Sequence, residues 1–236
     1  RIPTICKTRV IAQHQQIVRI DREKIDKTGS KEVNQKICNF VQKNITAFDA
    51  VIISDYGKGL ITPSLVNFLR AQALANKKII VVDPKVEHFG YYRNVTAITP
   101  NLKEAENAIR NIKITSKSTE TLDIHNDRLE TDEEIDLAGT ELLRYLQLDA
   151  LLITLGEHGI RVFERGKNPV SIQTKAQEVF DVTGAGDAVV SAFTLSLSAG
   201  ATNRQAAEIA NFAGGIVVGK IGAVAVTKEE LIKAIK

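Results

Sequence analysis

Four short apolar runs constrain the fold of this chain more than any other feature of its sequence. They are AVIISD, KIIVVD, TAIT and DALLIT, at residues 50–55, 78–83, 96–99 and 149–154. Runs of this kind are typical of strands that are buried on both faces. Because helical patterns separate them, they predict a mostly parallel sheet with helices on both faces. Ligands bind such sheets beyond the carboxyl ends of the strands, so the loops after these runs are the candidate binding regions.

Helical patterns between these runs carry recognisable N-terminal signals. Thr62 and the proline after it supply an N-cap and a first-turn proline for a helix that ends near Asn76. Residues 100–111 predict a short helix. Thr131 and Glu134 form a capping box that opens a further helix. Small residues dominate a later helical segment, and a capped helix ends the chain.

Several segments fall outside this alternating pattern. Residues 160–173 predict two short antiparallel strands joined by a turn that contains glycine. Near the start of the chain, residues 8–13 and 16–21 predict a β-hairpin outside the alternating unit. We expect residues 22–49 to be mainly helical and polar. Residues 113–132 are interpreted as an inserted surface loop, flexible at least in part.

Composition excludes several classes of function. The 31 basic and 28 acidic residues are too evenly balanced for a nucleic-acid surface, whereas anionic small molecules remain open as ligands. The two cysteines, Cys6 and Cys38, lack the spacing of a disulfide framework or a metal site and fit a reducing cytoplasm. No run approaches the roughly 18 apolar residues of a membrane span, and the N-terminus does not resemble a signal peptide. We expect a soluble, cytoplasmic protein without a membrane or nucleic-acid partner.

The segment DVTGAGD, residues 181–187, places two carboxylates around small residues directly before an apolar helix. A helix N-terminus has unpaired N–H groups and a positive partial charge. Gly184, Ala185 and Gly186 can therefore wrap a phosphate or the charge that develops during its transfer. Asp187 would repel that anion unless it accepts a proton from an attacking hydroxyl. The alternative is that Asp187 only caps the helix and that the glycines serve a tight turn.

Two other loops have two interpretations each. Asn101 and Glu104 lie one helical turn apart, where Glu104 can orient hydrated Mg²⁺, but a helix cap with a first-turn acid explains the same pattern. Thr154 and the backbone at Gly156 can receive the phosphates of a nucleotide, although TLGEHG by itself is a weak turn signal.

The segments NLKE, TLGEHG, DVTGAGD and ANFAGGIVVGKIG follow one another in an order and spacing that resembles the ribokinase-like (PfkB-type) carbohydrate kinases. The resemblance covers nearly the whole chain. Within that family, SDYGKG, DPK, TPNLKEAE, AQEVFDVTGAGD and VVGKIG look most like the kinases of D-glycero-β-D-manno-heptose 7-phosphate in lipopolysaccharide precursor synthesis. The resemblance implies a three-layer α/β/α sandwich with a mostly parallel sheet. It also implies that the γ-phosphoryl group of ATP is transferred to a sugar hydroxyl.

The resemblance also implies roles for individual residues. Asp187 matches the catalytic base, and the backbone of residues 184–187 matches the anion hole. Residues that match the sites for ATP and Mg²⁺ are Asn101, Glu104, Thr154, Gly156, Gly159, Asn211, Gly214 and Gly222. Asp181 and Thr183 match ligands of the K⁺ ion that many members hold. Residues expected on the side of the sugar phosphate are Arg9, Gln15, Gln16, Arg19, Lys58 and Lys85.

The chain departs from the family pattern at its start. The family begins with a strand that carries an acidic residue and a later Gly-Gly-x-x-Asn segment, and neither occurs here. The chain also starts at Arg1 and has no methionine, so we expect a fragment or trimmed product that lacks the first βα units and most of the lid. Residues 1–21 are then a remnant of the lid, and residues 22–236 are the nucleotide-binding core. No HxGH nucleotidyltransferase motif follows the kinase segments, and the family pattern allows a homodimer.

Competing functions remain. Another acceptor, such as fructose 1-phosphate, ribose or a nucleoside, would keep the same chemistry. A nucleotide-binding module without catalysis would use the same loops as a sensor or partner surface. A dinucleotide-dependent oxidoreductase is excluded because no GxGxxG follows the first predicted strand.

Overall fold

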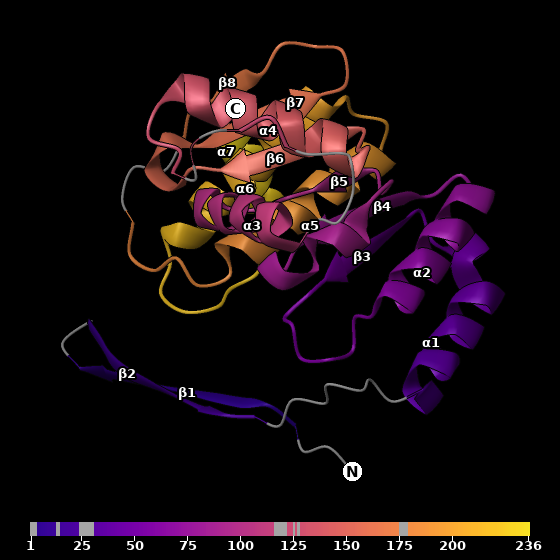
Figure 1. The fold of residues 1–236 in the computed structure, drawn as a ribbon. Helices are drawn as coiled ribbons and strands as arrows, with labels where there is room; N and C mark the ends of the chain where they lie inside the picture. Colours follow the sequence, from indigo (N-terminus) through magenta and orange to yellow (C-terminus); the bar gives the residue numbers. More distant parts are fainter. Residues whose placement is uncertain are drawn as a thin grey trace.

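The computed structural model describes residues 4–12, 15–23, 31–115, 122–124, 126, 128–174 and 179–236. Its centre is a six-stranded sheet in the order β3-β4-β5-β6-β7-β8 (Figure 1). The first four of these strands pair in parallel and the last two in antiparallel fashion, which confirms both sequence predictions. The strand bounds are β3 (Ala50–Ser54), β4 (Ile79–Asp83), β5 (Ala97–Ile98), β6 (Ala150–Thr154), β7 (Ile160–Glu164) and β8 (Val170–Ile172).

Helices connect and cover these strands. Thr62 caps α2 through its side chain, and Thr131 and Glu134 form the predicted capping box at the start of α4. Among the described residues, no helix combines the length and the apolar character that crossing a membrane would require. The helices are α1 (Lys31–Asn44), α2 (Pro63–Ala75), α3 (Leu102–Thr115), α4 (Asp132–Leu146), α5 (Ala185–Ser198), α6 (Asn203–Val218) and α7 (Lys228–Ile235), with short 3₁₀ turns η1 (Ile45–Ala47), η2 (Val86–Tyr92) and η3 (Gly156–His158).

Alternation along the strands divides the core into two layers. Val82 and Leu151 belong to a core that α2, α3 and α4 share. Their neighbours Val81 and Leu152 point to the other face and pack with Phe193 of α5 and the alanines of α6. Successive strand residues face opposite sides of a sheet, so each strand is apolar on both. This arrangement is the α/β/α sandwich expected from the sequence, and it brings the carboxyl ends of β3 to β6 to one edge.

The first two strands form a separate sheet. β1 (Cys6–Ala12) and β2 (Gln15–Arg22) pair in antiparallel fashion and do not join the six-stranded sheet, as predicted for a hairpin outside the alternating unit. Figure 1 shows this hairpin, in indigo, standing apart from the body of the molecule. Its described side chains are exposed, and a two-stranded hairpin is marginally stable by itself. Contacts with other parts of the chain therefore matter for its position.

The segment before α4 differs from the expected surface loop. The preceding helix α3 extends to Thr115, and Leu122, Ile124 and Leu129 are buried in the core. The backbone N–H of Leu129 donates to the Glu106 carboxylate at 3.1 Å. The interpretation as an exposed loop is therefore wrong for these residues, because their apolar side chains cover the core beside α3 and α4. Residues 116–121, 125 and 127 of the predicted loop lie outside the described residues.

Candidate active site

The N-terminus of α5 has the geometry predicted for the GAGD segment. Gly184 precedes the helix with φ of 84°, in the left-handed region that favours glycine. The helix begins at Ala185, and Asp187 lies in its first turn with an exposed side chain. The N–H groups of Gly186 and Asp187 have no acceptor within the helix, because first-turn N–H groups lack one. An anion placed here would meet these groups and the positive end of the helix dipole.

A hollow of about 730 Å³ lies directly beside this helix terminus. It brings together three regions that are far apart in the sequence: the loop after β6, the start of α5 and the middle of α6. Among its lining residues are seven of the predicted site residues, namely Thr154, Gly156, Gly159, Ala185, Gly186, Asn211 and Gly214. The hollow is large enough for a small-molecule ligand. Predicted donor-site residues therefore share one concave surface with the predicted anion hole.

Two of the glycines that line the hollow also have a structural reason to be glycine. A Cβ on Gly159 would collide with the carbonyl oxygen of Ile172 and lie 2.7 Å from the backbone nitrogen of Thr174. A Cβ on Gly214 would lie 3.0 Å from a methyl group of Val189. These glycines allow close approach of neighbouring elements. They shape the wall of the hollow whether or not they contact a ligand.

Asn211 is tied to the end of strand β8. Its side chain is buried, and its amide nitrogen donates to the carbonyl oxygen of Gln173 at 2.7 Å. This hydrogen bond holds α6 against the segment after β8. Contact of Asn211 with adenine remains a prediction, and the hydrogen bond fixes the side chain from which that contact would be made.

Asn101 and Glu104 form a reciprocal helix cap. The N–H of Asn101 donates to the Glu104 carboxylate, and the N–H of Glu104 donates to the Asn101 side-chain oxygen, both at 2.9 Å. The capping interpretation is therefore confirmed. Burial raises the pKa of Glu104, while the backbone of Asn101 and the charge of Lys85 act in the opposite direction. Asn101 also bridges to Thr154 at the end of β6, so the cap adjoins the predicted phosphate loop.

Asp181 organises the loop before α5. Its two carboxylate oxygens accept the N–H groups of Thr183 at 2.9 Å and Gly222 at 3.0 Å. Hydrogen bonds from Thr183 and Gly222 and the charge of Arg9 lower the pKa of Asp181. Gly222 was predicted for the ATP site, but it is not among the described residues that line the 730 Å³ hollow. The structure instead groups Gly222 with the two predicted K⁺ ligands.

Two residues near Asp187 were missed in the sequence. The hydroxyl of Tyr56, on the loop after β3, donates to Oδ1 of Asp187 at 3.3 Å. Asp83 ends β4, and burial together with the charges of Glu104, Asp187 and Asp55 raises its pKa to about 7. The predicted strand segments AVIISD and KIIVVD both end in aspartate, and neighbouring parallel strands end at the same edge of a sheet. That signal alone would have indicated a group of carboxylates here.

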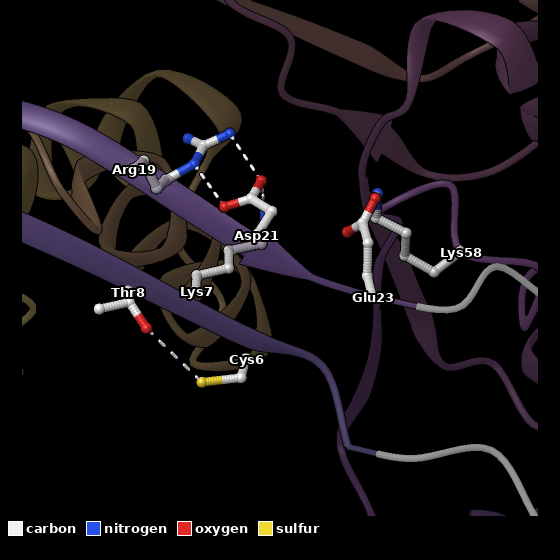
Figure 2. A network of polar contacts seen from close by, with 7 residues as sticks. All are labelled: Cys6, Lys7, Thr8, Arg19, Asp21, Glu23 and Lys58. Carbon is white, nitrogen blue, oxygen red and sulfur yellow. Dashed lines mark hydrogen bonds and ion pairs between the residues drawn. The ribbon is translucent and has the colours of Figure 1, made fainter.

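The residues predicted for the sugar phosphate lie on the hairpin and on two loops. Lys58 forms an ion pair of 2.6 Å with Glu23, and Arg19 donates twice to Asp21, at 2.8 and 3.0 Å (Figure 2). Arg9 lies across the hairpin from Arg19. The backbones of Gln15 and Gln16 belong to β2, but their side chains lie outside the described residues. Lys85 lies beside the loop of Lys58, where its side chain packs against Gly57.

The sequence pattern that defines the pfkB family carbohydrate kinases matches residues 1–230. The chain belongs to this family. Among curated proteins, it is 42% identical over 232 residues to the bifunctional protein HldE of Geotalea uraniireducens, covering 97% of this chain and 43% of that protein. It is 39% identical over 233 residues to HldE of Helicobacter hepaticus, covering 99% of this chain and 45% of that protein. The chain thus spans less than half the length of these two relatives.

Solved structures of carbohydrate kinases share the fold. Escherichia coli phosphofructokinase-2 in complex with substrates and products superimposes with a TM-score of 0.72 at 15% identity, over 97% of this chain and 68% of that one. Ribokinase of Arabidopsis thaliana, complexed with ribose and ATP, gives a TM-score of 0.67 at 18% identity, over 93% and 65%. At these identities the likeness extends to the fold. It confirms the ribokinase-like architecture predicted from the sequence.

Proposed function

We propose that this pfkB-family chain transfers the γ-phosphoryl group of ATP to a sugar hydroxyl, with Asp187 as the base. The position of Asp187 carries this proposal: it lies in the first turn of α5, beside the hollow lined by the predicted nucleotide loop. A carboxylate at the edge of an anion site is unfavourable unless it handles a proton. Family membership supports the reaction class.

The residues at the α5 terminus suit an in-line transfer. Asp187 takes the proton of the acceptor hydroxyl as that oxygen bonds to the γ-phosphorus, and the bond to the oxygen of the departing ADP breaks. The N–H groups of Gly186 and Asp187 stabilise the negative charge that develops on the transferred group. Positioning and electrostatics supply most of the catalysis in such reactions.

Mg²⁺ and K⁺ fit the residues that are present. No group of three or more His, Cys, Asp or Glu side chains suited to a metal ion occurs among the described residues. Mg²⁺ in kinases usually keeps several waters and binds substrate phosphates with one or two carboxylates, which suits Glu104 acting through water. Bound there, it neutralises phosphate charge, and the crowding of carboxylates around Asp83 favours a cation nearby. Asp181 and Thr183 offer oxygen atoms for K⁺ on a loop already fixed by hydrogen bonds.

We propose O1 of D-glycero-β-D-manno-heptose 7-phosphate as the acceptor, for ADP-heptose synthesis. Identity of about 40% to several HldE proteins supports this choice over other sugars. A phosphorylated acceptor also suits the cationic side chains on the hairpin and adjacent loops, namely Arg9, Arg19, Lys58 and Lys85. Fructose 1-phosphate, ribose and nucleosides are the alternatives.

A panel of acceptors tests the proposal. ADP release is measured with each candidate sugar, with HldE of Geotalea uraniireducens as the positive control. We expect the highest kcat/KM with heptose 7-phosphate; a higher value with another acceptor would replace the proposed substrate. Asp187→Asn should lower turnover by orders of magnitude while ATP still binds. The control Asp149→Asn, at the end of β6 away from Thr154, should leave turnover unchanged. ATP binding without turnover in the unmodified chain would favour the non-catalytic nucleotide-binding module.

A further inference from the structure

The hydroxyl group of Tyr56 meets the carboxylate assigned as the base. It donates to Oδ1 of Asp187 at 3.3 Å, across 131 residues of sequence. Tyr56 is 57% exposed and has no role in the apolar core. Asp187 is exposed as well, and its side chain would otherwise sample several rotamers. The contact therefore serves the site rather than the packing of the fold.

A buried carboxylate holds the loop that carries Tyr56. Asp55, the residue before it, accepts the N–H of Gly57 at 2.7 Å and the hydroxyl of Tyr92 at 2.5 Å. Nδ1 of His88 lies 2.7 Å from the same carboxylate. The backbone N–H of Asp55 donates to the carbonyl oxygen of Asp83 at 3.0 Å, which continues the β3–β4 pairing. Buried and bonded on every side, Asp55 fixes the direction in which the loop leaves the sheet.

Gly57 brings this loop close to its neighbour. Its φ of 65° is in the left-handed region, and a Cβ there would lie 3.1 Å from the side chain of Lys85. The turn is therefore tight and packed against the loop after β4. Tyr56 reaches Asp187 from a rigid support, which a positioning residue requires.

We propose that Tyr56 is a positioning residue for the catalytic step, and this rests on the proposed function of Asp187 as base. Its O–H holds Oδ1, so that Oδ2 is presented to the acceptor hydroxyl. The Asp187 carboxylate can accept both hydroxyl groups at once, since each of its two oxygens accepts hydrogen bonds independently. Partial burial and the charge of Asp187 raise the pKa of Tyr56, while the side chain of Ser54 acts in the opposite direction, and the net upward shift keeps the phenol a donor at neutral pH. Asp187 on α5 and Asp83 at the end of β4 are the acidic groups that face it.

A double-mutant cycle separates positioning from a structural role. We expect Tyr56→Phe to lower kcat about tenfold, the effect of losing one hydrogen bond to a charged group, with little change in the KM for ATP. In the Asp187→Asn background, the same substitution should have no further effect, because Tyr56 acts only through that carboxylate. The control Tyr145→Phe removes a hydroxyl on α4, away from α5. Equal losses in both backgrounds, or no loss in either, would overturn the proposal.

A titration that needs no enzyme activity tests the contact itself. Tyrosine ring carbons are labelled with ¹³C, and the Tyr56 signal is assigned by its absence in Tyr56→Phe. Asp187→Asn should move the ionisation of Tyr56 to lower pH, because it removes the charge and acceptor that oppose loss of the phenolic proton. An unchanged Tyr56 titration would overturn the contact. Full turnover in Asp187→Asn would instead contradict the proposed function, while this titration still decides whether Tyr56 holds Asp187.

Discussion

The ammonium group of Lys58 lies 2.6 Å from the carboxylate of Glu23, which joins the end of the hairpin to the loop after β3 (Figure 2). The side chains are 26% and 22% exposed, so water screens the pair only in part. The ion pair draws Lys58 toward the hairpin that carries Arg9 and Arg19. It couples the position of the hairpin to the loop that also carries Tyr56.

Removing the charge of Glu23 should loosen the hairpin without unfolding the core. Because ion pairs at the protein surface typically contribute about 1 kcal/mol or less and this pair links the hairpin rather than the core, we expect Glu23→Gln to leave global stability nearly unchanged. Amide hydrogens of residues 6–12 and 15–22 should exchange faster, as measured by hydrogen-exchange mass spectrometry. Glu32→Gln is the matched control, because it breaks an ion pair with Lys36 on α1. Equal exchange of the hairpin in both variants would show that the Lys58 contact does not anchor it.

Two glycines of the predicted nucleotide loop should differ sharply on substitution by alanine. Both have positive φ, 61° at Gly156 and 87° at Gly159, but only Gly159 faces the backbone of residues 172–174. We expect Gly156→Ala to cost about 1 kcal/mol of strain and Gly159→Ala about 3 kcal/mol or more. Urea unfolding of the two variants measures the difference. Similar losses would mean that strain alone, and not the approach of the β8 backbone, requires Gly159.

Local signals explain what could be predicted from the sequence. The capping box of Thr131 and the glycine before α5 act within one helical turn, and each continuous apolar run lies within a single strand. The pairing of Tyr56 with Asp187 depends on how β3 and α5 pack, and nothing local to either residue encodes it. For Asn101, the sequence allowed either a helix cap or a ligand-binding role. The structure shows the cap with Glu104, and this cap adjoins Thr154 of the predicted phosphate loop. Long-range contacts decide such cases.

The segment before α4 shows the same limit and yields a stability prediction. Leu129 is 3% exposed although its polar neighbours indicate a surface loop, so we expect Leu129→Ala to cost about 2 to 4 kcal/mol. Leu74→Ala is the matched control, because Leu74 on α2 is 79% exposed and its truncation should change stability by about 0.5 kcal/mol or less. Urea unfolding measures both. Equal effects would contradict the burial of Leu129.

Asp83 should make stability depend on pH from the acidic range up to about pH 7. Burial, followed by the charges of Glu104, Asp187 and Asp55, raises its folded pKa from 3.8 to about 7, whereas the unfolded chain keeps the ordinary value. Between these values the folded state holds the proton and the unfolded state does not, so the contribution of Asp83 to stability falls as pH rises and then stays constant above about pH 7.

Asp83→Asn removes this penalty and should therefore stabilise the fold at higher pH. At about 1.4 kcal/mol for each tenfold change in the proton equilibrium, the gain at about pH 8 is at most on the order of 4 kcal/mol, and it should vanish below about pH 3, where both states hold the proton. Urea unfolding in metal-free buffer across this range measures the difference from the unmodified chain. Asp149→Asn serves as the control, because Asp149 is exposed and pairs with Arg165 at the opposite end of β6. A constant difference at all pH values would show that the folded state does not raise the pKa of Asp83.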